Sequence, residues 1–206
     1  MQSILKISSD RWLKLLAGLI CFGAGIAFMK QSQLGLSPWE VLHDGLSKIS
    51  GIQIGTVSIF IGILVLLLWI PIREKPGIGT VLNILIIGTV TNLTLLITPI
   101  SSQFLIQIFW LTVGLLTIGL GSALYLSSRL GAGPRDGLMM AFYRRSGWSI
   151  RLVRSIIEIS VLLIGWLIGG TVGIGTLAFA LGIGPIIQFM FRLIGDHELA
   201  SSRSRA

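Results

Sequence analysis

Acidic, basic and imidazole side chains gather just after two Gly/Pro breaks in the sequence. Residues 34–38 read Leu-Gly-Leu-Ser-Pro, residues 130–134 read Leu-Gly-Ala-Gly-Pro, and an acid, Glu40 or Asp136, follows each stretch. Proline suits the first position of a helix, and Ser37 with Glu40 matches a capping box. The pattern therefore predicts a short helix after each break, with a carboxylate in its first turn.

The N-termini of these short helices offer free N–H groups and partial positive charge to an anion. Three interpretations remain open: an amphipathic helix in the membrane interface, a re-entrant half-helix that dips toward the bilayer centre, and a structured loop. An apolar stripe from Trp39 to Ile49 lies opposite a polar face that includes His43 and Asp44. We therefore favour interfacial or shallow re-entrant helices.

Three polar residues lie inside long apolar segments. Glu158 is one turn after Arg154, and intramembrane acids are functional candidates, although an i,i+4 ion pair explains this one equally well. Asn92 and Gln188 lie at equivalent positions of an internal repeat, and hydrogen bonding between helices is their alternative role. The residues that we expect to line a solute path are Trp39, Glu40, His43, Asp44, Asn92, Arg135, Asp136, Glu158 and Gln188.

The sequence carries no recognisable catalytic or metal-binding motif. His43 is expected on the surface face of a short helix and His197 in a polar tail, and neither has metal ligands at a familiar spacing. The nucleophile, phosphate-binding and zinc-protease motifs are absent from the sequence. We therefore expect no enzyme, no metal and no cofactor.

Composition indicates a membrane protein, with the lipid bilayer as its surroundings. The chain is 53% hydrophobic and only 12% charged, whereas soluble domains carry about a quarter charged residues. Its net charge of +8 does not indicate nucleic acid, because the basic residues divide by membrane side. Apolar segments long enough to cross a bilayer are predicted at 12–29, 55–71, 77–98, 104–127, 150–169 and 172–194.

The basic residues predict the orientation of these six spans. With the N-terminus in the cytoplasm, inside segments hold 14 of the 16 lysines and arginines, and outside segments hold only Lys30 and Lys48. Both termini are then cytoplasmic, in segments 1–11 and 195–206. Short links at 99–102 and 169–171 predict that the spans they join are antiparallel neighbours.

The sequence contains an internal repeat. A shift of 96 residues aligns 18–92 with the second half without gaps, so that 12–98 and 104–194 form two three-helix units. An odd number of spans per unit predicts that the units are inverted in the membrane, as in many secondary transporters. The motif positions that repeat are Gly35, Pro38, Gly77, Gly79 and Thr80 in the first unit, and Gly131, Pro134, Gly173, Gly175 and Thr176 in the second.

The glycines of these motifs favour close packing. Gly-Ile-Gly-Thr opens the third span of each unit, at 77–80 and 173–176, and lets another segment approach the backbone. A flexible hinge, or carbonyl groups that line a path, is the functional alternative. Gly23 with Ala27, and the equivalent Gly119 with Ala123, predict helix–helix contacts.

The motifs at 34–47, 76–80, 130–139 and 169–176 resemble those of the YczE-like bacterial membrane proteins, which are grouped with the wider YitT-like membrane proteins. The resemblance covers roughly 12–192. It implies a multi-pass protein of the bacterial cytoplasmic membrane. It supplies neither a reaction nor active-site residues.

Together these features predict an all-α membrane protein of six transmembrane helices in two inverted three-helix repeats, each with a short Gly/Pro-initiated interfacial or re-entrant helix. The function that we favour is transport or export of an unidentified small solute, because inverted repeats with paired Gly/Pro breaks are typical of transporters. The alternative is a non-transporting scaffold or regulatory protein that acts through a membrane-protein partner. The small size also fits a homodimer.

Overall fold

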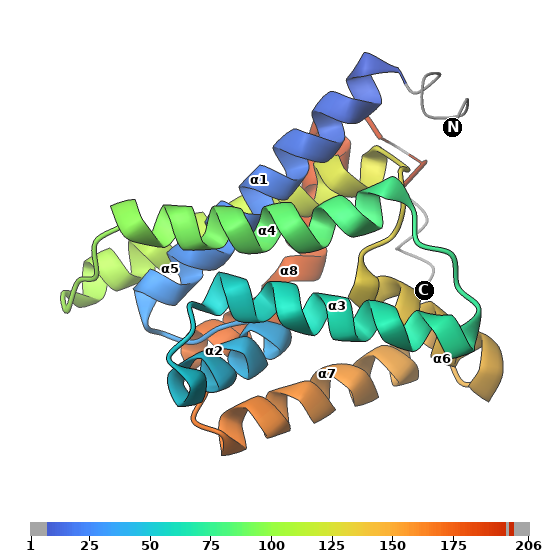
Figure 1. Cartoon of the computed structure of the whole chain (residues 1–206). Coiled ribbons are helices and arrows are strands. Elements are labelled where there is room, and N and C mark those ends of the chain that lie inside the picture. Colours follow the sequence, from blue (N-terminus) through green and yellow to red (C-terminus); the bar gives the residue numbers. More distant parts are fainter. Residues whose placement is uncertain (1–7, 197, 200–206) are drawn as a thin grey trace.

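The computed structural model describes residues 8–196 and 198–199, which form helices and no strands. Most of the predicted terminal segments, including His197, lies outside these residues. The helices are α1 (Ser9–Ser32), α2 (Pro38–Ser50), α3 (Ile54–Ile72), α4 (Ile78–Ile97), α5 (Phe104–Ser127), α6 (Pro134–Ser146), α7 (Ile150–Leu167) and α8 (Ile174–Leu193) (Figure 1). Two short helices therefore begin at Pro38 and Pro134, as predicted, and the structured-loop interpretation is wrong.

Five of the long helices, α1, α3, α4, α5 and α8, are long and apolar enough to cross a membrane. The sixth, α7, has 18 residues but carries Arg151, Arg154 and Glu158 in its first half. Large apolar side chains cover the outer surface, including Ile97 at 82% exposure and Leu105 at 80%. Such a surface suits hydrocarbon and not water, which supports a membrane protein.

The centre of the fold is the crossing of α1 and α5, the most extensive helix contact in the described structure. A Cβ added at Gly18 would lie 2.8 Å from the Gly121 carbonyl oxygen, and one at Gly25 would lie 2.9 Å from that of Gly114. The 96-residue shift relates Gly18 to Gly114 and Gly25 to Gly121. The two halves thus exchange the same contacts, as in a two-fold symmetric interface.

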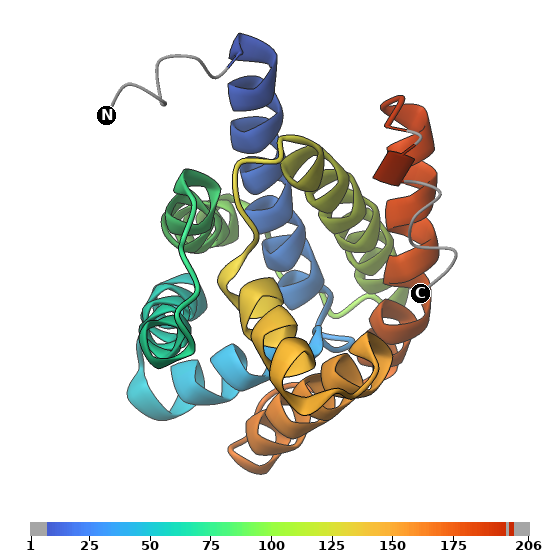
Figure 2. The same ribbon diagram turned by 90° about the vertical axis from the view of Figure 1, so that its right-hand side faces the viewer.

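The remaining helices surround this crossing (Figure 2). Helix α4 packs against α1 and α3, α8 packs against α5, and α2 lies against α7. The predicted contacts of the small residues are present, because Gly23 abuts Ile87 of α4 and Gly119 abuts Ile186 of α8. The helices joined by the short links at 99–102 and 169–171 do not pack extensively on each other. Helix α4 packs on α1 and α3 and α5 packs on α1 and α8, whereas α7 packs on α2 and α6 and α8 packs on α5.

Candidate functional site

A central cavity of about 160 Å³ lies between the two halves. Helices α2 and α6 both begin at it, since Ser37, Pro38 and Trp39 line it on one side and Pro134 and Arg135 on the other. The C-terminal ends of these helices point away from each other. Lys48 of α2 reaches the Gly169 carbonyl, whereas Arg145 of α6 reaches that of Pro71.

The Leu-Gly-x-x-Pro loop of each half docks on the Gly-Ile-Gly-Thr motif of the other. The Gly175 N–H donates to the Leu34 carbonyl at 2.7 Å, and the Gly79 N–H donates to the Leu130 carbonyl at 2.9 Å. A Cβ at Gly173 would lie 2.4 Å from the Leu34 oxygen, so the close-packing interpretation of this motif is confirmed.

Gly35 and Gly131 turn the chain at these docking points. Their φ angles are 121° and 133°, which side chains rarely adopt. Thr80 adds a hydrogen bond from its hydroxyl to the Ala132 carbonyl at 2.7 Å. The two loops are thereby fixed just before the prolines, which sets where α2 and α6 enter the cavity wall.

An ion pair joins the first turns of α2 and α6. Arg135 Nη2 lies 2.7 Å from Glu40 Oε1, and the guanidinium stacks 5.0 Å from the Trp39 ring centre. Glu40 is 3% exposed. The predicted capping box is wrong, because the Ser37 side chain caps nothing and the Glu40 carboxylate faces Arg135 instead.

His43 follows one turn later on α2 and also lines the cavity. It is 2% exposed, so the prediction of a surface position is wrong. The polar face of α2 turns inward, because Glu40, His43 and Asp44 are all buried within the protein. Its Nδ1 lies 3.8 Å from Glu40 Oε1, and its Nε2 is buried without a hydrogen-bond partner.

Asp136 and Tyr125 form the opposite wall. The Tyr125 hydroxyl donates to Asp136 Oδ2 at 3.2 Å, and both residues line the cavity. Tyr125, Ser122 and Asn83 were not predicted as lining residues. The sequence does not single these residues out, because isolated polar residues also occur in the other apolar segments.

The cavity continues sideways between α7 and α8. A second hollow there shares Glu158, Phe179 and Ile183 with the central cavity. Arg154 Nε pairs with Glu158 Oε1 at 2.8 Å, as predicted, and the two side chains are 47% and 31% exposed. This ion pair therefore lies at the edge of the opening.

Three predicted path residues lie away from the cavity. Asp44 is bound by Lys30, by Lys48 at 3.0 Å and by the Thr171 N–H at 2.8 Å, which ties α2 to the ends of α1 and α7. The other two are Asn92, which bridges α3 and α4, and Gln188, which is half-buried on α8. The structure thus brings Trp39, Glu40, His43, Arg135, Asp136 and Glu158 together around the cavity or its ion pairs.

The fold and its apolar surface define a multi-helix membrane protein with a central cavity lined by apolar and charged side chains. Residues 9–192 match a family of unknown function (DUF6198). The chain is 36% identical over 181 residues to the uncharacterized membrane protein YczE of Bacillus subtilis, covering 87% of this chain and 84% of that protein. The chain therefore belongs to this YczE-like family.

Two further relatives span a similar length. An uncharacterized protein of Haemophilus influenzae is 43% identical over 181 residues, covering 87% of this chain and 83% of the relative. The uncharacterized protein YyaS of Bacillus subtilis is 28% identical over 190 residues, covering 90% and 94%. No solved structure gives a significant match.

Proposed function

We propose that this protein is a six-span transporter of the bacterial cytoplasmic membrane, which carries a small solute through the central cavity. The observation that carries the proposal is the meeting of two short helices at a cavity, with an ion pair between their first turns that joins half-buried Arg135 to buried Glu40. Buried charges are costly in a membrane and are kept mainly where they serve a path or a site.

The reciprocal contacts of the two halves support an inverted repeat. The reciprocal contacts of Gly18 with Gly121 and of Gly25 with Gly114 are those expected when a two-fold axis relates the halves. When such an axis lies in the membrane plane, each half can adopt the conformation of the other, and the cavity then opens to alternate sides. In this topology α7 is the fifth span and α8 the sixth, and α2 and α6 are re-entrant.

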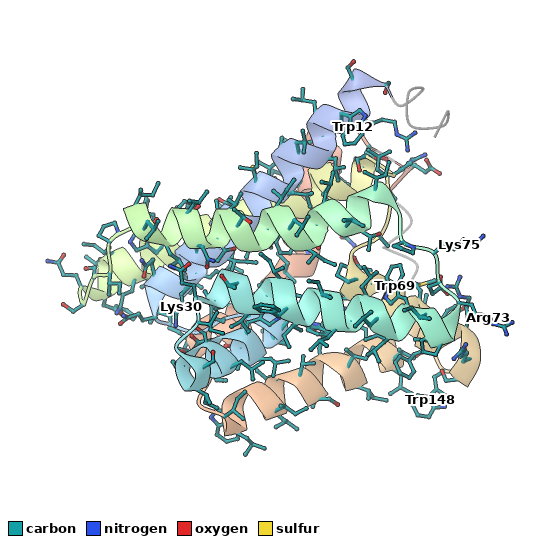
Figure 3. All side chains as sticks on the ribbon, in the orientation of Figure 1. Trp12, Lys30, Trp69, Arg73, Lys75 and Trp148 are labelled. Atoms are coloured by element: carbon teal, nitrogen blue, oxygen red, sulfur yellow. The ribbon has the colours of Figure 1, made fainter. Side chains whose placement is uncertain are left out.

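The charge distribution supports cytoplasmic termini. Arg73 and Lys75 lie at one end of the molecule and Lys30 lies at the other (Figure 3). With both termini in the cytoplasm, 14 of the 16 basic residues belong to sequence segments on the cytoplasmic side, which include the segment of Arg73. The positive-inside rule then assigns that end to the cytoplasm.

Cysteine labelling tests the transporter proposal without a known substrate. Ser58→Cys and Ser122→Cys place thiols in the cavity wall, in a Cys21→Ala background. Thr91→Cys is the control, because Thr91 is 2% exposed and lies outside the cavity. We expect a membrane-impermeant thiol reagent to label the two cavity cysteines in both right-side-out and inverted vesicles, and to leave the Thr91 variant unlabelled.

Labelling from one side alone under all conditions would contradict alternating access. It would favour the second candidate, a scaffold that binds another membrane protein. An exposed basic and aromatic end supports that candidate, since Tyr143, Arg144, Arg145 and Trp148 are all exposed near the start of α7. A stable partner crosslinked at Trp148, together with a sealed cavity, would establish it.

A further inference from the structure

We propose that the cavity holds a small monocarboxylate, with its carboxylate between Arg135 and His43 and its apolar body toward α8. This inference rests on the proposed transport path and names the class of solute that the path would carry. The two side chains come from opposite halves of the protein and line one cavity.

His43 supplies the first observation. Its imidazole is 2% exposed, and Nε2 has no hydrogen-bond partner although it is buried. Buried polar atoms nearly always have a partner, so an unpaired one in a cavity wall points to a missing ligand. No hydrogen bond fixes Nδ1, because 3.8 Å from Glu40 is beyond hydrogen-bond range. The imidazole proton can therefore lie on Nε2 and be donated to a ligand oxygen.

Arg135 supplies the second group. A guanidinium has five N–H donors, and the described contact with Glu40 uses one nitrogen, Nη2. The side chain remains 29% exposed and lines the cavity, so it can also donate to a bound carboxylate. Stacking on Trp39 at 5.0 Å holds its plane in place.

The two helix N-termini add to the attraction for an anion. The first helical hydrogen bonds are donated by Val41 in α2 and by Gly137 in α6. The N–H groups before them belong to first turns that meet at the cavity, where helix dipoles favour negative charge. The 13-residue length of each helix is enough for this effect.

Charge and volume restrict the ligand to a small monoanion. Glu40 and Asp136 already place two carboxylates near the site, so a dianion such as a phosphate monoester would be repelled more strongly. A cavity of about 150 Å³ in another protein holds benzene, and this one measures about 160 Å³. Its apolar wall includes Ile61, Val65, Ile84, Ile118, Phe179 and Ile183.

Benzoate is the probe that tests this inference. Binding would be measured on the whole purified protein in detergent, by the thermal unfolding midpoint and by tryptophan fluorescence, at constant ionic strength. Inorganic phosphate, benzyl alcohol and benzylamine are the comparison probes for a phosphate, a neutral and a cationic ligand. We expect benzoate to raise the midpoint in a saturable manner, and the other three to have little effect.

His43→Leu and Met139→Leu form a matched pair. The 96-residue shift relates these positions, and both side chains line the cavity, but only His43 has a ring N–H to donate. We expect His43→Leu to weaken benzoate binding about tenfold to a hundredfold, the range for a hydrogen bond to a charged group, and Met139→Leu to change it by less than about threefold. Neither change leaves a buried charge unpaired, so both variants should fold.

Three results would overturn the inference. They are benzoate binding that survives in His43→Leu, preferential binding of benzylamine, which would assign the cavity to cations near Asp136, and no binding of any probe. None of them changes the expected two-sided labelling of Ser58→Cys. Failure of the carboxylate site can therefore be told apart from failure of the transport proposal, in which that labelling is lost.

Discussion

The two halves of the molecule share a fold but pair their last two long helices differently. In the first half α3 and α4 pack along each other, and in the second half the equivalent α7 and α8 diverge (Figure 2). A Cβ at Gly88 would lie 2.3 Å from the Gly55 carbonyl oxygen, whereas one at the equivalent Gly184 would meet nothing within 4 Å. The two halves therefore differ in packing between these helices, which are in contact in the first half and separated in the second.

Side-chain size at equivalent positions explains the opening. Gly55 and Gly62 of α3 pack against α4, and the 96-residue shift replaces them with Arg151 and Glu158 on α7. Long charged side chains prevent two backbones from approaching closely and favour water or headgroups. The closed pair therefore forms a continuous wall, and between the open pair a second hollow continues the cavity.

The largest expected effect on stability comes from replacing a glycine by alanine in each helix pair, at Gly88 of α4 and at the equivalent Gly184 of α8. Gly88→Ala forces its Cβ to 2.3 Å from a backbone oxygen, so overpacking should lie at the upper end of its range of about 1–3 kcal/mol. Because alanine's helix propensity returns about 1 kcal/mol, we expect a net loss of about 2 kcal/mol. Gly184→Ala has free space and should be neutral or stabilising by up to about 1 kcal/mol. Thermal unfolding of both purified variants measures this. Equal destabilisation would mean that α7 and α8 pack as α3 and α4 do.

An intermediate effect on stability is expected from removing the amide side chains at the two equivalent positions Asn92 and Gln188. Asn92 Oδ1 accepts from the Gly55 N–H at 2.8 Å, and Nδ2 donates to Thr56 Oγ1 at 2.9 Å. Asn92→Ala leaves a helix N–H unpaired and should cost about 1 kcal/mol. Gln188→Ala should cost less than about 0.5 kcal/mol, because it bridges no comparable pair. Denaturant titration of both variants tests this, and a greater cost at Gln188 would contradict the comparison.

Sequence reasoning predicted both short helices and their proline starts, because glycine and proline constrain the backbone locally. It also predicted the Arg154–Glu158 pair, which depends only on helical spacing. It placed Asp44 in a solute path, whereas the structure places it under Lys30 and Thr171, because the partners of a buried charge come from distant segments. His43 was misplaced for the same reason: the sequence marks the polar face of α2 but not what covers it.

The divergence of α7 and α8 was also beyond the sequence prediction. A short link at 169–171 says that the helices are close at one end, and does not fix the angle between them. That angle is set by α5, on which α8 packs, and by α2, on which α7 packs. The 96-residue shift already shows that charged residues replace Gly55 and Gly62 in the second half. The effect of this difference on packing depends on the contacts of these glycines with α4, which only the structure shows.

The smallest expected effect on stability is at the edge of the opening. Glu158→Gln breaks a half-exposed ion pair and should change the free energy of unfolding by less than about 0.5 kcal/mol. Asp10→Asn is the control, since Asp10 and Lys14 also form an i,i+4 ion pair at 2.7 Å, with the acid first, and neither residue lines the cavity. Thermal unfolding should therefore not distinguish the two variants.

Access to the cavity should distinguish them. Loss of the Glu158 negative charge should raise the rate at which an anionic thiol reagent modifies Ser58→Cys, severalfold at low salt and less at high salt, because salt screens the repulsion. Asp10→Asn should leave that rate unchanged. If neither variant alters it, the Arg154–Glu158 pair is only a helix-stabilising contact. The reagent then reaches the cavity by another route, and the divergence of α7 and α8 has no part in access.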